Sequence, residues 1–400
     1  MPKNDYNIAD DARGASKITV DAVREITGIV EALHKTILHV GGIRGPLHKT
    51  RTRGITGFVF RIIYKIIDIV GYSTGKLLAQ LSIIIEKKTS TLQREAIISA
   101  LNGVIGDYLE TSENPLAIQM QFRKNGKVLT FAEITSEVQM EEPRILLMIH
   151  GLCMNDLQWT QKGYNHGEKI ARELGYTPLY LHYNTGRHIS TNGREFSELL
   201  EKLTSFLPEK STFSFLTHSM GGLVSRSAIH YAKLNDFTWH KKLRKLVFLG
   251  TPHFGAPMER GGNWLETLLE ANPFSAPFAR LGKVRSSGIT DLRYGNLTDD
   301  DWENKDRFDR SLKPISHLPL PDSIDCYAVA TTTSKREGLI KTEIIGDGLV
   351  PLKSALGQHE EPGKSLNFPP EHTLVLRKEN HLGLLNNPEV YKKLSFWLAN

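Results

Sequence analysis

The chain has 400 residues, 40% hydrophobic and 24% charged, which suits one large domain with an appendage. Its two cysteines, Cys153 and Cys326, are too few for a disulfide framework. The N-terminus lacks the basic start and apolar core of a signal peptide, and no uncharged apolar run reaches the roughly 18 residues of a membrane-spanning helix. These features predict a cytoplasmic protein of a reducing compartment, although export without a cleaved signal stays open.

The formal net charge is +6, and the basic residues are unevenly distributed. No acidic residue occurs between Ala32 and Ile67, whereas the same window contains several lysines and arginines. Such a block favours an anionic partner such as a membrane surface, a nucleic acid or an acidic protein. A basic face that simply contacts water is the alternative.

The N-terminal part divides into a polar tail, residues 1–15, and a helical module, residues 16–112. Apolar residues recur at helical spacing in 16–38 and in about 54–70, and Ser90 with Gln93 forms a capping-box pattern for a further helix that ends near Tyr108. Two interpretations fit this isoleucine-rich module. It is either a small bundle packed on the main domain, or a helix hairpin at a membrane surface, with peripheral membrane contact through residues 16–110.

From residue 113 to residue 400 the pattern changes to alternating strands and helices. An antiparallel hairpin is predicted first, with a strand over 116–122, a turn at Asn125-Gly126 and a return strand over 128–131. Further strands are predicted over 144–149, 177–183, 213–216, 243–249, 324–330 and 372–376, and helices over 167–174, 195–207, 223–234 and 388–398. This alternation of strands and helices predicts an α/β fold, a mainly parallel sheet with helices on both faces.

A nucleophile candidate lies where the strand over 213–216 gives way to a helix. The connecting sequence is Thr217-His-Ser-Met-Gly-Gly222, which places Ser219 at the apex of a sharp strand–turn–helix unit. Such a turn lifts the serine hydroxyl clear of the sheet. Small residues are needed on either side because backbone crosses backbone there. Gly221 meets this need, whereas Thr217 stands where the common pattern has glycine.

A base and an acid to accompany the serine are expected near the ends of later strands. His381 follows the last predicted strand, and an imidazole there has a pKa suited to taking the serine proton. His372 and His359 are its rivals. Asp347, in a glycine-flanked turn after the 324–330 strand, is the candidate for orienting the imidazole. Its rival Asp325 begins that strand and so falls at the other edge of the sheet.

Two backbone N–H groups complete the predicted site, those of Leu152 and Met220, which would stabilise an oxyanion. Aromatic residues also occur in a long insertion, about 256–315, which would cover the serine as a mobile lid or as a fixed wall. Trp264, Phe274 and Phe278 are the substrate-binding candidates from this insertion.

Taken together, these segments resemble the lipase/esterase branch of the α/β-hydrolase superfamily over roughly residues 115 to 400. The motifs that carry the resemblance are His150-Gly-Leu152, Thr217-His-Ser-Met-Gly-Gly222, Gly250-Thr-Pro-His-Phe-Gly255, Gly346-Asp-Gly-Leu-Val-Pro351 with Ser354-Ala-Leu-Gly357, and Asn380-His-Leu382.

The resemblance implies a Ser219, Asp347 and His381 triad with an oxyanion hole at Leu152 and Met220. It implies hydrolysis of acyl or lipid esters through an acyl-enzyme. We expect no cofactor, no metal and no nucleic-acid partner. Secreted bacterial lipases carry a calcium-binding aspartate where this chain has Gly383, a further reason to expect no metal. Two alternatives remain, an acyltransferase that uses the same triad and a non-catalytic scaffold that binds membranes or a partner.

Overall fold

A computed structural model describes residues 91–138, 140–255, 286–305, 317–333 and 346–399. The predicted helices between residues 16 and 90 lie outside these ranges. So does the part of the insertion that contains Trp264, Phe274 and Phe278. Among the helices within these ranges, none combines the length and the apolar character that a membrane crossing requires.

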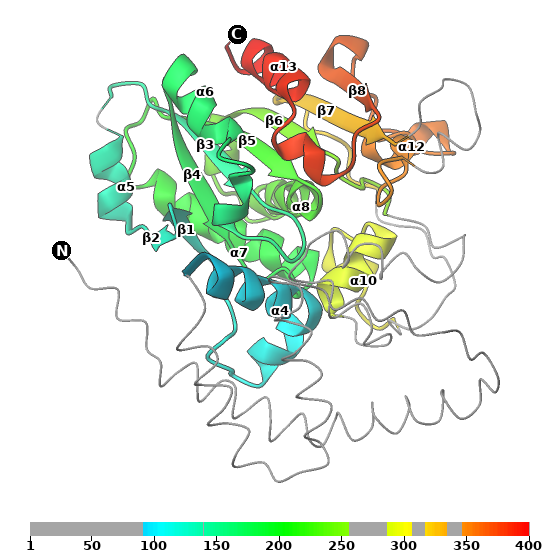
Figure 1. The fold of residues 1–400 in the computed structure, drawn as a ribbon. Helices are drawn as coiled ribbons and strands as arrows, with labels where there is room; N and C mark the ends of the chain where they lie inside the picture. The colour runs from blue at the N-terminus through cyan, green and yellow to red at the C-terminus, as the bar shows by residue number, and fades with distance from the viewer. Residues whose placement is uncertain (1–90, 139, 256–285, 306–316, 334–345, 400) are drawn as a thin grey trace, which may run out of the picture.

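The described part is built on one eight-stranded sheet with the order β2-β1-β4-β3-β5-β6-β7-β8 (Figure 1). The six strands from β4 to β8 in this order are parallel, and at one edge β1 pairs antiparallel with both β4 and β2. The strands are β1 (Gln121–Lys124), β2 (Lys127–Val128), β3 (Arg144–Ile149), β4 (Tyr176–His182), β5 (Thr212–His218), β6 (Leu243–Leu249), β7 (Asp325–Thr332) and β8 (Thr373–Arg377).

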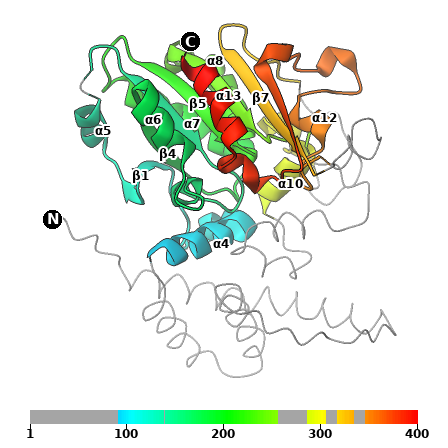
Figure 2. The same ribbon diagram turned by 45° about the horizontal axis from the view of Figure 1, so that its top comes forward.

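The helices bury both faces of the sheet. They are α4 (Thr91–Thr111), α5 (Phe131–Glu137), α6 (His166–Leu174), α7 (Ile189–Thr204), α8 (Met220–Leu234), α10 (Ser287–Tyr294), α12 (Leu352–Ala355) and α13 (Pro388–Ala399). Alternate residues of β3 enter two separate cores: Ile145 and Leu147 pack with residues of α7 and α8, whereas Leu146 and Met148 pack with residues of α6 and α13. Figure 2 shows α6 and α13 side by side over one face of the sheet. Because both faces are covered, the central parallel strands β3 and β5 are buried at every position after the first.

This architecture confirms the predicted fold class. A mainly parallel sheet with helices on both faces, and a sharp turn from β5 into α8 that carries a serine, is the α/β-hydrolase fold.

The predicted hairpin needs correction at both ends. Strand β1 begins only at Gln121, because the backbone of Leu116 and Ile118 bonds to the side chain of Asn102 in α4 instead of to a neighbouring strand. The predicted return strand 128–131 is also too long. Residue 131 begins α5, and Thr130 caps this helix in a capping box with Glu133.

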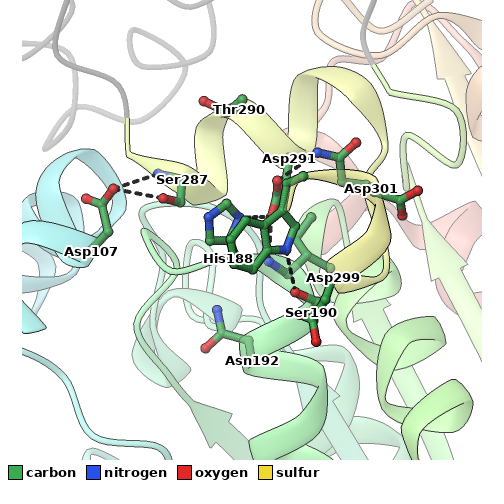
Figure 3. Close-up of polar contacts among 12 residues, drawn as sticks. Asp107, His188, Ser190, Asn192, Ser287, Thr290, Asp291, Asp299 and Asp301 are labelled. Carbon is green, nitrogen blue, oxygen red and sulfur yellow. Dashed lines mark hydrogen bonds and ion pairs between the residues drawn. The ribbon is translucent and has the colours of Figure 1, made fainter. Parts of the chain in front are cut away.

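The described end of the insertion, residues 286–305, is fastened to the body of the protein (Figure 3). The buried carboxylate of Asp291 in α10 accepts hydrogen bonds from the N–H of Ile189 (2.8 Å) and the ring Nδ1 of His188 (2.9 Å), where α7 begins. The backbone N–H and the hydroxyl of Ser287 both donate to Asp107 of α4. This end of the insertion is therefore bonded to α4 and to the start of α7.

Replacement of Asp291 by alanine should lower the free energy of unfolding by about 2–4 kcal/mol, because it leaves the buried N–H of Ile189 without an acceptor and breaks a partly buried contact with His188. Urea unfolding followed by circular dichroism measures this. The matched control is Asp300→Ala, an exposed aspartate in the same segment, which should change stability by less than about 0.5 kcal/mol. Equal stabilities of the two variants would contradict the role of this contact.

Candidate active site

Ser219 occupies the turn between β5 and α8 with a backbone conformation of φ 54° and ψ −121°. Residues other than glycine rarely adopt it, and such strain persists only where the surroundings impose it. Here the Ser219 N–H donates to the carbonyl of Leu249 in β6 (2.9 Å). A Cβ atom on Gly221 would lie 2.3 Å from the carbonyl oxygen of Ile149, so only glycine lets the helix pass this close to β3.

Thr217, the departure from the common serine-turn pattern, is accommodated without crowding the turn. Its side chain is fully buried, and its hydroxyl donates to the carbonyl of Val247 in β6 (3.0 Å). The threonine thus gains a hydrogen bond that satisfies its one polar group. On the other side of the serine, Gly151 approaches so closely that a Cβ there would lie 3.0 Å from the Ser219 Cβ.

Asp347 and His381 are in direct contact, although 34 residues separate them. The Oδ2 atom of Asp347 accepts a hydrogen bond from the Nδ1 of His381 at 2.5 Å, and both side chains are buried. The second carboxylate oxygen, Oδ1, accepts from the backbone N–H groups of Leu349 (2.9 Å) and Val350 (2.8 Å). The carboxylate is therefore held by its own turn on one side and faces the imidazole with the other.

The His381 ring lies beside the turn that carries Ser219. It packs against the ring of His218 with centroids 4.7 Å apart, and His218 donates from Nε2 to the carbonyl of His381 (3.3 Å). On another side, a Cβ on Gly250 would lie 3.0 Å from the His381 Cε1. The Nε2 atom of His381 is buried and has no hydrogen-bond partner in the described ranges, Ser219 included. The ring is thus fixed at Nδ1 and open to a partner at Nε2.

The two expected oxyanion donors lie at neighbouring strand ends, the Met220 N–H at the start of α8 and the Leu152 N–H in the turn after β3. That turn, residues 151–154, is closed by a hydrogen bond from the Met154 N–H to the Gly151 carbonyl (3.3 Å). Neither the Leu152 N–H nor the Met220 N–H has an acceptor among the residues that the structure describes.

The rival acid and bases lie elsewhere. Asp325 is exposed at the start of β7, and His372, at the start of β8, contacts the carbonyl of Cys326. His359 packs against Phe254 with ring centroids 4.9 Å apart. Within the described ranges, no group of three or more histidine, cysteine or acidic side chains has the geometry of a metal site.

His218 is the residue of this site that the sequence reasoning missed. Its position next to Ser219 was visible in the sequence, but only the fold shows that it packs on His381. Burial, reinforced by the nearby His381, holds the pKa of His218 well below its usual value of 6.5. Its ring is therefore uncharged at neutral pH.

His166 fixes the short helix that follows His381, and its protonation should destabilise the fold. Its Nε2 donates to the Leu384 carbonyl (3.0 Å), and burial lowers its pKa from the usual 6.5 to about 4. Between pH 6.5 and 4 the unfolded chain therefore binds more protons at this residue, so stability falls as the pH falls through this window.

Replacement of His166 by glutamine should reduce the slope of the free energy of unfolding against pH by about 1.4 kcal/mol per pH unit within this window. Chemical unfolding at pH values from 8 to 4 measures the slopes for both proteins. Above pH 7 the imidazole is neutral in both states, so there the slopes should agree. Parallel curves throughout the acid range would show that His166 is not a source of the acid sensitivity.

One family model matches part of the chain. A family model described as "Domain of unknown function (DUF7379)" matches residues 116–273. No curated protein matches the chain.

Similar solved structures include lipases and a carboxyl esterase. The mature form of Bacillus licheniformis lipase BlEst2 has 15% identity and a TM-score of 0.41, over 65% of this chain and 93% of that one. Aspergillus fumigatus lipase B has 10% identity and a TM-score of 0.41, over 70% and 55%. The metagenomic carboxyl esterase MGS0156 has 18% identity and a TM-score of 0.36, over 66% and 75%. At such values the similarities say nothing about activity, and the fold assignment rests on the strand order and the serine turn.

Proposed function

We propose that this chain is a serine hydrolase that cleaves carboxylic esters of acyl or lipid type through an acyl-enzyme intermediate. The observation that carries the proposal is the buried hydrogen bond between Asp347 and His381, whose Nε2 has no partner in the described chain, beside the strained turn of Ser219. In this assignment Ser219 is the nucleophile, His381 the general base and acid, and Asp347 the group that orients the imidazole.

In the first half of the reaction the Ser219 hydroxyl oxygen attacks the ester carbonyl carbon, and its proton passes to the His381 Nε2. The carbonyl oxygen becomes an oxyanion, which the Leu152 and Met220 N–H groups would bind. When the tetrahedral intermediate collapses, the bond to the leaving alkoxide breaks, and the His381 Nε2 returns the proton to that oxygen. An acyl group is then attached to Ser219.

In the second half a water molecule gives its proton to the His381 Nε2 and attacks the acyl carbon. When the second tetrahedral intermediate collapses, the bond between the acyl carbon and the Ser219 oxygen breaks. The His381 Nε2 returns its proton to that oxygen, and the carboxylic acid is released. Asp347 stays ionised and keeps the Nδ1–H in place throughout. Because His218 is uncharged at neutral pH, its ring packs on His381 without opposing the positive charge that forms there.

Replacement of Ser219 by alanine should remove the nucleophile and lower the hydrolysis of p-nitrophenyl esters by about 10⁴-fold or more. It should also abolish labelling by a fluorophosphonate probe. Ser136→Ala, which changes an exposed serine of α5, is the control and should leave both measurements unchanged. Undiminished turnover in the Ser219 variant would overturn the proposal.

Replacement of Asp347 by asparagine should keep the shape of the site but present an N–H to the imidazole Nδ1, which favours the wrong tautomer. In serine proteases the corresponding change lowers kcat by about 10⁴-fold. We expect a loss of about 10²–10⁴ in kcat with a much smaller change in KM. The matched control is Asp325→Asn at the exposed start of β7, which should retain kcat. If the two variants behave alike, Asp347 does not have this role.

A further inference from the structure

One face of α4 lies against the turn that carries the Leu152 N–H. In Figures 1 and 2, α4 lies beside α10 below the sheet. The residues on this face recur every four positions, at Glu95, Ser99 and Gly103, as neighbours on one side of a helix do.

The closest contact is between Gly103 and Cys153, the residue after Leu152. A Cβ on Gly103 would lie 2.2 Å from the Cys153 Sγ and 3.0 Å from both the Cα and the N of Cys153. The thiol also contacts the carbonyl of Ala100 at 3.8 Å. Glycine at position 103 therefore sets how closely the helix and the turn approach each other.

Cys153 has a backbone φ of 60°, in the left-handed region that favours glycine. It is the third residue of the 151–154 turn, a position where a positive φ is characteristic of type II turns. Its N–H donates to the hydroxyl of Thr185 (3.1 Å), in the loop after β4, which itself contacts α4. The turn is thus held in its strained form between α4 and this loop.

Two polar contacts continue this support beyond the turn. The side-chain Nδ2 of Asn155 donates to the hydroxyl of Ser99 (3.1 Å), and both residues are buried. Arg123 of β1 then bridges Glu95 of α4 (2.7 Å) and Asp156 (3.3 Å), again within the protein interior. Contacts at residues 153, 155 and 156 therefore fix the loop after β3 to a single helix.

We propose that α4 positions the Leu152 N–H for the developing oxyanion, with Gly103 as the positioning residue at its centre. This inference rests on the hydrolase function proposed above. Oxyanion donors work through geometry, because each must meet the oxygen of the transition state at about 2.7–3.1 Å. Because α4 packs against Cys153, the position of this helix fixes the position of the neighbouring Leu152 N–H relative to the oxyanion.

Gly103→Ala adds a methyl group where the Cys153 thiol now lies. The part of α4 before its kink at Ile105 (φ −135°) is anchored by the buried Glu95–Arg123 pair, so we expect the four-residue turn to move. We expect kcat for p-nitrophenyl esters to fall by about 10²-fold while KM changes by less than about threefold, the pattern of an interaction made mainly in the transition state.

The rescue variant is Cys153→Gly, which removes the thiol and suits the positive φ of this residue. In the Cys153→Gly background the same Gly103→Ala change should lower kcat by less than about tenfold, because only the 3.0 Å backbone contacts remain. Gly106→Ala is the matched control on the same helix. Its new Cβ would lie 1.9 Å from the Asn184 Oδ1, so Cys153→Gly should recover none of the loss it causes.

An unchanged kcat in folded Gly103→Ala protein, or an equal recovery of both glycine variants by Cys153→Gly, would overturn the inference. If Gly103→Ala does not fold, Ser99→Ala is the variant that tests the inference. It removes the acceptor for Asn155 and should lower kcat several-fold at unchanged KM, whereas full activity would count against the inference. A failure of the proposed function is separate, because Ser219→Ala would then keep wild-type turnover.

Discussion

The close approach of backbone to backbone at the turn between β5 and α8 is the constraint on which the rest of the site depends. Ser219 is held at φ 54° because its N–H bonds to β6 while α8 passes against β3 at Gly221. Neither contact is available to the isolated segment, since each needs a neighbouring strand of the parallel sheet. The strain at one serine is therefore maintained by the packing of three strands and a helix.

The strand order extends this constraint to residues far away in the chain. Because β6, β7 and β8 lie in sequence beside β5, the loops after β7 and β8 reach the same end of the sheet as Ser219. Asp347 and His381 meet there, and His218 and Gly250 bound the imidazole from two further sides. The position of the ring is thus fixed by contacts on three sides.

The helix α4 shows that the sheet is not the only support of the site. It ties β1, the loop after β3, the loop after β4 and the start of α10 together through contacts of Glu95, Gly103, Gly106 and Asp107. A segment N-terminal to the first strand is consequently part of the same packed body as the strand ends. The end of the insertion, residues 286–305, is bonded to this body rather than detached from it.

The sequence by itself determined the fold class and the candidates for chemistry. The strands 144–149 and 243–249 were predicted with the bounds that the structure has, because each contains a run of buried apolar residues, 145–149 and 246–249, as strands covered on both faces do. Ser219, Asp347 and His381 were named from their residue types and their places after strands. The hairpin was predicted less well, since the Asn102 side chain competes for the backbone of residues 116–118 and the Thr130 capping box was not recognised.

Only the tertiary structure decided which residues touch. Three contacts of this kind join segments that are distant in the chain or belong to different elements. They are the packing of His218 on His381, the hydrogen bond from Thr217 to the Val247 carbonyl, and the close approach of Gly103 to Cys153. Periodicity and motifs report how a segment folds locally, because they depend on neighbours along the chain. Distances between such segments depend on packing at van der Waals contact, which no local pattern encodes.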